Sequence, residues 1–186
     1  MAANSRSAPA DGQALGGVTL VLGPEDLLAD RAVAAAVGSV HAADPDADRT
    51  ELEAATLAPG ALAELTSPSL FATARAVVIR GLDAVPAESV DALLDYAAHP
   101  QPDVALVLVH RGGQKGRGVV DKLRKLGVRV VACDGLKSYE LSAFVTREVR
   151  SAGGRIGDDA AHLLVESVGS DLRALAGATA QLISDT

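Results

Sequence analysis

A short loop near the start of the chain lies where nucleotide-binding α/β domains carry their phosphate-binding loop. It follows the apolar run 18–22 and reads Gly23-Pro24-Glu25-Asp26. A functional loop needs several backbone N–H groups directed at the phosphates, with a lysine and a serine or threonine for phosphate charge and magnesium. The lysine and the further glycines are absent here, and Glu25 and Asp26 would repel a triphosphate. We therefore expect no ATP site at this loop.

A second glycine-rich loop, from Gly112 to Gly118, lies between a predicted strand and a predicted helix. Gly113 and Gly118 have the spacing of the outer glycines in a phosphate-binding loop, but Val119 and Val120 replace the lysine and the hydroxyl residue. The dinucleotide-binding pattern G-x-G-x-x-G is also matched only in part. The loop is either a solvated turn or the site of a nucleotide-binding α/β protein, and the second reading is our alternative for the whole chain.

The same stretch carries the one concentration of positive charge in an acidic chain. Such a stretch is either a solvated face with cations at a helix C-terminus or a surface that contacts a phosphate backbone or a partner protein. The candidates for contact with DNA or with another subunit are Arg111, Lys115, Arg117 and Lys122.

Other reactive residues give little support for catalysis or metal binding. The four histidines lack the spacing of metal ligands, and neither G-x-S-x-G nor H-E-x-x-H occurs. Residues 44–48 begin like a calcium loop, but Arg49 and Ala55 stand where the turn glycine and the bidentate glutamate belong. The single cysteine, Cys133, cannot form an internal disulfide, which fits a reducing cytoplasm. We expect no catalytic residue, no metal and no cofactor.

The segment Ser67-Pro68-Ser69-Leu70-Phe71 is the most informative part of the sequence. Its two adjacent bulky apolar residues lie among small, turn-forming ones, so neither a helix period nor a strand period explains the pair. On a tight turn, Leu70 and Phe71 could both project outward and anchor an apolar pocket of a partner. The alternative is a turn tucked onto the core.

The elements that would position these residues alternate between strands and helices. Apolar runs predict buried strands at 18–22, 76–79, 104–109 and 128–132, and alternation predicts a half-exposed strand at 50–54. Helical spacing predicts helices at 25–40, 61–65, 87–98 and 119–126. We expect a mainly parallel sheet with helices on both faces. After residue 136 the pattern is helical only, with helices at 139–152, 158–168 and 171–183.

These patterns divide the chain into a flexible tail at 1–16, an α/β domain at 17–136 and a small helical domain at 137–186. The composition, with 48% apolar residues and a net charge of -7, is that of a globular protein and argues against binding nucleic acid by overall charge. No apolar signal segment and no run of about 20 apolar residues is present. We expect a soluble cytoplasmic protein without contact to a membrane.

In element order and in several short motifs, the chain resembles the δ subunit of the bacterial DNA polymerase III clamp loader, in its actinobacterial style. The resemblance extends from Val18 over nearly the whole chain. It is carried by Leu22-Gly23-Pro24-Glu25-Asp26, Ser67-Pro68-Ser69-Leu70-Phe71, Asp95-Tyr96, His99-Pro100 and Gly169-Ser170-Asp171-Leu172-Arg173.

The resemblance implies an AAA+-like, P-loop NTPase-like sheet whose nucleotide site is degenerate, followed by a small three-helix lid domain. Arg80 and Gly81 then stand where an active AAA+ ATPase has Asp-Glu for magnesium and water activation. The chain is therefore expected to be a non-catalytic subunit of a holoenzyme that as a whole is a DNA-directed DNA polymerase.

The resemblance also implies a role in DNA replication, which is to bind the β sliding clamp and open its ring for loading onto primed DNA. Leu70 and Phe71, with Ser69, would form the wedge that enters the clamp's hydrophobic pocket. Further partners would be the τ/γ and δ′ subunits, mainly through a helical collar domain for which these 186 residues leave no room, and primer-template DNA.

Overall fold

The structure is a computed structural model that describes residues 14–67 and 73–185. It folds into two compact units, Met1–Asp134 and Gly135–Thr186, which are described separately. None of the helices in the described part of the chain is long and apolar enough to span a membrane.

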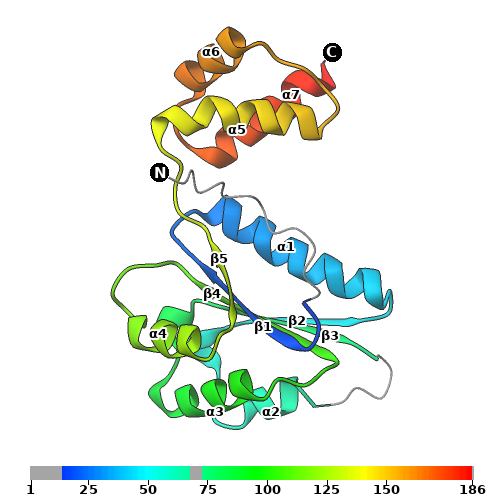
Figure 1. The fold of residues 1–186 in the computed structure, drawn as a ribbon, viewed down its shortest axis with the longest axis vertical. Helices are drawn as coiled ribbons and strands as arrows, with labels where there is room; N and C mark the ends of the chain where they lie inside the picture. The colour runs from blue at the N-terminus through cyan, green and yellow to red at the C-terminus, as the bar shows by residue number, and fades with distance from the viewer. Residues whose placement is uncertain (1–13, 68–72, 186) are drawn as a thin grey trace. The chain divides into compact units, whose positions relative to one another are not determined.

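The first unit is built on a five-stranded parallel sheet with the order β2-β3-β4-β1-β5 (Figure 1). Its three inner strands, β3, β4 and β1, are buried on both faces, which explains their uninterrupted apolar runs. The edge strand β2 alternates between half-buried and exposed positions over most of its length, as half-exposed strands do. The strands are β1 (Gly17–Leu22), β2 (Asp48–Glu53), β3 (Arg75–Arg80), β4 (Val104–His110) and β5 (Arg129–Ala132).

Helices cover both faces of this sheet, as the sequence predicts. On one face, α1 (Asp26–Ala43) places Val33 and Val37 in a core cluster with Val107 of β4. On the other face, α3 and α4 place Leu93 and Leu123 in a second cluster. Figure 1 shows α1 on one side of the strands and the other three helices opposite, with bounds α2 (Ala61–Leu65), α3 (Ala87–Ala98) and α4 (Arg117–Lys125).

The strand order brings three chain segments together at one edge of the sheet. Because β1 lies between β4 and β5, Leu22 is paired with His110 on one side and with Ala132 on the other. The loops that follow these three parallel strands therefore meet at the carboxyl edge, which is where open α/β sheets bind ligands.

The second unit consists of three helices, and α5 packs against both of the others. Phe144 and Leu141 of α5, Ala161 of α6, and Leu172 and Leu175 of α7 are buried. The helices are α5 (Ser138–Ser151), α6 (Asp158–Val168) and α7 (Leu172–Ser184). Asp171 caps α7, since its carboxylate accepts the N–H of Ala174 at 2.6 Å.

Some helix ends differ from the predicted ones. Helix α1 begins at Asp26 and not at residue 25, because Glu25 is its N-cap. The helix predicted to end at residue 126 ends at Lys125 as α4. The chain then turns through Gly127 at a φ of 77°, and Leu126 is 44% exposed. The N-cap of α6 is Gly157, which makes no side-chain hydrogen bond.

Candidate functional site

The turn between β1 and α1 has no free set of amides for a phosphate. The N–H of Gly23 donates to the carbonyl oxygen of His110 and the N–H of Glu25 to that of Cys133, both at 3.0 Å. Pro24 has no N–H, and the N–H of Leu27 donates to the Glu25 carboxylate at 3.3 Å. Only three residues separate β1 from α1, so the loop is also too short to wrap around a phosphate.

The backbone of Gly23 explains why this turn is fixed in place. Its φ is 149°, and a Cβ at this position would overlap the carbonyl group of Cys133. The Cys133 thiol is buried beside Asp134 and Glu25, and burial first, then these two carboxylates, raise its pKa to about 11. The thiol therefore stays protonated at neutral pH and is not a nucleophile.

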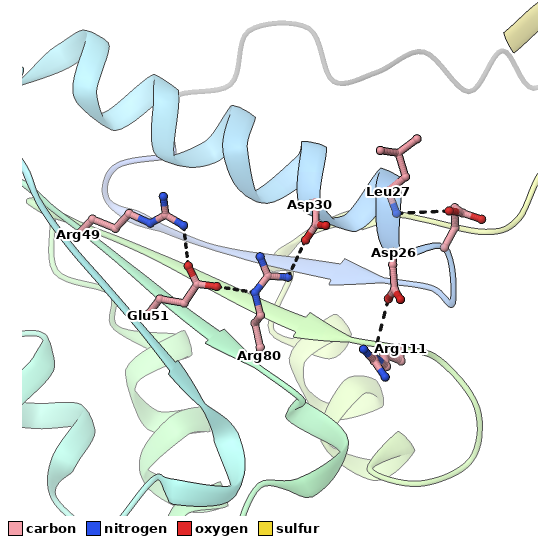
Figure 2. A network of polar contacts seen from close by, with 8 residues as sticks. Asp26, Leu27, Asp30, Arg49, Glu51, Arg80 and Arg111 are labelled. Atoms are coloured by element: carbon pink, nitrogen blue, oxygen red, sulfur yellow. Dashed lines mark hydrogen bonds and ion pairs between the residues drawn. The ribbon is translucent and has the colours of Figure 1, made fainter. Parts of the chain in front are cut away.

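At the end of β3, Arg80 lies in a network of ion pairs (Figure 2). Its Nη1 lies 3.0 Å from a carboxylate oxygen of Asp30 on α1, and its Nε donates to Glu51 of β2 at 2.5 Å. Arg49 donates to the other oxygen of Glu51. Hydrogen bonds from Arg80 and then Arg49 lower the pKa of Glu51, and the bond to Glu51 raises the pKa of Arg80. The end of β3 thus carries a cation that is ion-paired to two carboxylates.

The loop after β4 wraps around the buried side chain of His110. The N–H of Gly112 donates to Nδ1 of His110 at 2.9 Å, and Nε2 lies 2.9 Å from the carbonyl oxygen of Lys115. Beside the loop is a depression of about 250 Å³, smaller than the roughly 300–1,000 Å³ of typical ligand pockets. It is lined by Arg117 and Arg124 but also by Asp121 and Asp134. The two carboxylates oppose binding of a nucleotide phosphate there.

The candidate contact residues Arg111, Lys115, Arg117 and Lys122 are all exposed on this loop and on α4. Three of them lie near carboxylates: Arg111 Nε is 3.7 Å from Asp26, Lys115 Nζ is 3.7 Å from Asp83, and Arg117 Nε is 4.0 Å from Asp121. Such exposed pairs are weak and easily exchanged. Lys122 begins a cationic last turn of α4 that also contains Arg124 and Lys125.

The residues Ser69, Leu70 and Phe71 lie outside the described residues, but the chain on both sides of them is described. On the N-terminal side, Arg75 Nη1 donates to the carbonyl oxygens of Leu65 at 2.8 Å and Ser67 at 3.1 Å. On the C-terminal side, the Thr73 hydroxyl donates to Asp44 at 2.5 Å and thereby lowers the pKa of that carboxyl. Both flanks are thus tied to the sheet unit.

Sequence reasoning did not single out Arg75 or His110. Each acts by bonding backbone carbonyl or N–H groups, which every sequence contains, so residue type alone gave no signal. The one signal in the sequence was that His110 follows an apolar run directly and precedes the glycine-rich loop. Within residues 14–67 and 73–185, no group of three or more His, Cys, Asp or Glu is placed to hold a metal ion.

The strand order, the helices on both faces and the helical second unit define the class of fold, an AAA+-like α/β sheet followed by a small helical unit. The predicted fold class is therefore confirmed. Comparison with solved structures places the Bacillus subtilis DNA clamp loader delta protein (YqeN) among the similar folds, with a TM-score of 0.63, 18% identity, and coverage of 91% of this chain and 53% of that one.

The Thermotoga maritima RuvB Holliday junction branch migration motor is also similar, with a TM-score of 0.54, 17% identity, and coverage of 92% and 55% of the two chains. A single-residue variant of RuvB gives a TM-score of 0.56 at 16% identity and coverage of 90% and 55%. At these identities the likeness shows the fold alone. The chain spans about half the length of these structures. No family model and no curated protein matches the sequence.

Proposed function

We propose that this chain provides the first two domains of a clamp-loader δ subunit: it binds the β sliding clamp and opens its ring for loading onto primed DNA. The observation that carries the proposal is the structural similarity to a clamp loader delta protein over 91% of the chain. The Ser69-Leu70-Phe71 motif and the other motifs of the sequence agree with it. The proposed location is the cytoplasm, with the replication machinery.

In this proposal the subunit does no nucleotide chemistry itself. The N–H groups of Gly23, Glu25 and Leu27 after β1 are already bonded, and Glu25 and Asp26 add negative charge at the same turn. Arg80 stands at the end of β3 in place of an acid. Other subunits of the loader would hydrolyse ATP while this chain holds the clamp open, and its partners among them would be the τ/γ and δ′ subunits.

Leu70 and Phe71 are proposed as the residues that enter the clamp's apolar pocket, and Ser69 as a further clamp-binding residue. The support from the structure lies in the flanks. Arg75 fixes the chain up to Ser67, and Asp44 fixes it from Thr73 onward. An anchor held at both ends loses less conformational entropy on binding than a free tail.

The test is the double variant Leu70→Ala/Phe71→Ala, measured for affinity to purified β clamp and for denaturant midpoint in the same preparation. Loss of two buried side chains, at about 1.5–3 kcal/mol each, should weaken binding by about two orders of magnitude or more. Stability should change by no more than about 0.5 kcal/mol. Leu163→Ala, which truncates a leucine that is 61% exposed on α6, is the matched control. A large fall in midpoint with unchanged clamp affinity would refute the assignment.

A second part of the proposal is that Arg111, Lys115, Arg117 and Lys122 contact primer-template DNA. All four side chains are exposed on one loop and the helix that follows it. Binding should fall steeply with added salt because phosphate contacts release counterions. Replacing Lys115, Arg117 and Lys122 together with glutamine should weaken DNA binding and flatten that salt dependence. Unchanged binding would make the surface a solvated face or a contact with another subunit.

A further inference from the structure

The loop after β4 is organised around one imidazole ring. His110 is the last residue of β4 and is 1% exposed. One ring nitrogen is bonded to the N–H of Gly112 and the other to the carbonyl oxygen of Lys115, each at 2.9 Å. The ring therefore links the first and last parts of a single loop.

These two contacts fit only one protonation state of the ring. Nδ1 faces an N–H group, so it must act as an acceptor and carry no hydrogen. Nε2 faces a carbonyl oxygen, which can only accept, so Nε2 must carry the hydrogen. The ring is thus the neutral Nε2–H tautomer. A doubly protonated ring would direct a donor at the N–H of Gly112.

The glycines of the loop let the backbone close onto the ring. Gly112 and Gly116 have φ values of 85° and 70°, which other residues rarely adopt. A Cβ at Gly116 would lie 3.1 Å from Nε2 of His110 and 2.7 Å from the Cα of Asp83. The loop is therefore packed between the ring and Asp83, whose carboxylate also lies 3.7 Å from Lys115 Nζ.

We propose that His110 is a positioning residue for the basic loop: as the neutral Nε2–H tautomer, it sets the backbone from Arg111 to Gly116 and so directs Lys115 and Arg117 at the phosphate backbone of DNA. This rests on the proposed DNA contact and deepens it. Gly116 is the N-cap of α4, so a displaced loop would also displace Arg117, the first residue of that helix.

The first test is nitrogen-15 NMR of the imidazole rings in the whole chain. The His110 signals are assigned by their loss in His110→Gln, and the exposed His99 serves as an internal reference. We expect a protonated Nε2 and an unprotonated Nδ1 at neutral pH. The opposite tautomer, or a mixture of the two tautomers, would overturn the proposal.

The second test separates the two hydrogen bonds by amide exchange. In His110→Asn, the side-chain amide oxygen can accept a hydrogen bond near the position of Nδ1. In His110→Gln, the longer side chain instead places an NH2 donor near the position of Nε2. Exchange of the Gly112 amide should therefore quicken about fivefold in the glutamine variant and stay slow in the asparagine variant. Exchange in the central strand β4 reports whether either variant is globally destabilised. Equal Gly112 exchange in both variants, relative to β4, would contradict the assignment.

The third test measures binding to a short primed DNA at low salt. His110→Asn changes no charge, but it removes the hydrogen bond to the Lys115 carbonyl oxygen and should therefore weaken DNA binding several-fold. The double variant Lys115→Gln/Arg117→Gln removes both cations and gives the largest loss of affinity to be expected. Unchanged affinity in His110→Asn would overturn the positioning role. If the unmodified chain does not bind DNA, the DNA contact itself is wrong, while the ring and exchange measurements still decide whether His110 sets the loop.

Discussion

At the scale of single residues, the side chain of Arg80 joins three elements of the first unit. It bonds to Asp30 of α1 and to Glu51 of β2 from its place at the end of β3. The side chain thus links one helix to two strands of the sheet.

The Glu51 carboxylate should make stability depend on pH. Its pKa is lowered in the folded state from an ordinary value of 4.5, so its contribution is complete above that value and is lost as pH falls through the lowered pKa. Glu51→Gln should therefore be less stable than the unmodified chain at pH 7, and the difference should shrink below about pH 4.5. Denaturant midpoints from pH 7 to pH 3 measure this. Glu88→Gln, on the exposed side of α3, controls for net charge. A stability difference between Glu51→Gln and the unmodified chain that does not change with pH would contradict this role of Glu51.

Arg75 should matter for stability more than a surface arginine. Its side chain is 18% exposed and donates to two backbone carbonyl groups. Lysine has one nitrogen and cannot bond these two carbonyl groups while also reaching Asp48, which lies 3.5 Å from the second guanidinium nitrogen, Nη2, so Arg75→Lys should cost about 1–2 kcal/mol in unfolding free energy. Arg49→Lys, at a side chain that is 48% exposed, should change it by no more than about 0.5 kcal/mol. Similar urea midpoints for the two variants would mean that Arg75 does not anchor this segment.

At the scale of elements, the β1–α1 turn depends on Gly23. Gly23→Ala should destabilise the fold by about 2 kcal/mol or more, because its Cβ would overlap the Cys133 carbonyl group. A Cβ at Gly38, inside α1, would meet no atom of another element within 4 Å, so Gly38→Ala should stabilise by about 0.5–1 kcal/mol. Thermal unfolding of the two variants measures both changes in stability. Destabilisation of equal size in both would show that the turn can adjust.

The alternation of strands and helices could be predicted because each element carries its own period. Helices α3 and α6 have the expected bounds, since Pro86 and His99-Pro100 frame the first and glycines frame the second. Ends that depend on tertiary contacts were less certain: α1 continues to Ala43, three residues beyond the predicted end. Leu126 was predicted to be the last residue of a helix, but α4 ends one residue earlier, at Lys125.

The site was predictable only where a residue type is itself informative. The missing lysine and the acids at positions 25 and 26 already argued against a nucleotide. The strand order was not determined by any local pattern, and it alone brings the ends of β1, β4 and β5 together. The bonds that occupy the Gly23 and Glu25 amides come from those neighbouring strands. They could not be read from the loop's own sequence.

At the scale of the whole molecule, the fold retains the arrangement of an AAA+-like sheet while its carboxyl edge is closed by the protein's own groups. Main-chain bonds tie the β1–α1 turn to both neighbouring strands, and His110 occupies the interior of the loop after β4. What remains open there is the small depression beside Arg117 and Arg124. This closure agrees with the proposal that the chain holds a partner protein and does not bind a nucleotide.

These bonds lead to a prediction for the 186-residue chain: its dissociation constant for ATP with magnesium should be no lower than about 1 mM. The N–H groups of Gly23, Glu25 and Leu27 are bonded within the protein, and acidic residues place negative charge around the remaining space: Glu25, Asp26, Asp121 and Asp134. Isothermal titration calorimetry, with an active P-loop ATPase as positive control, measures the affinity. A micromolar dissociation constant that is lost in Arg117→Gln/Arg124→Gln would instead support the alternative, a nucleotide site at the loop from Gly112 to Gly118.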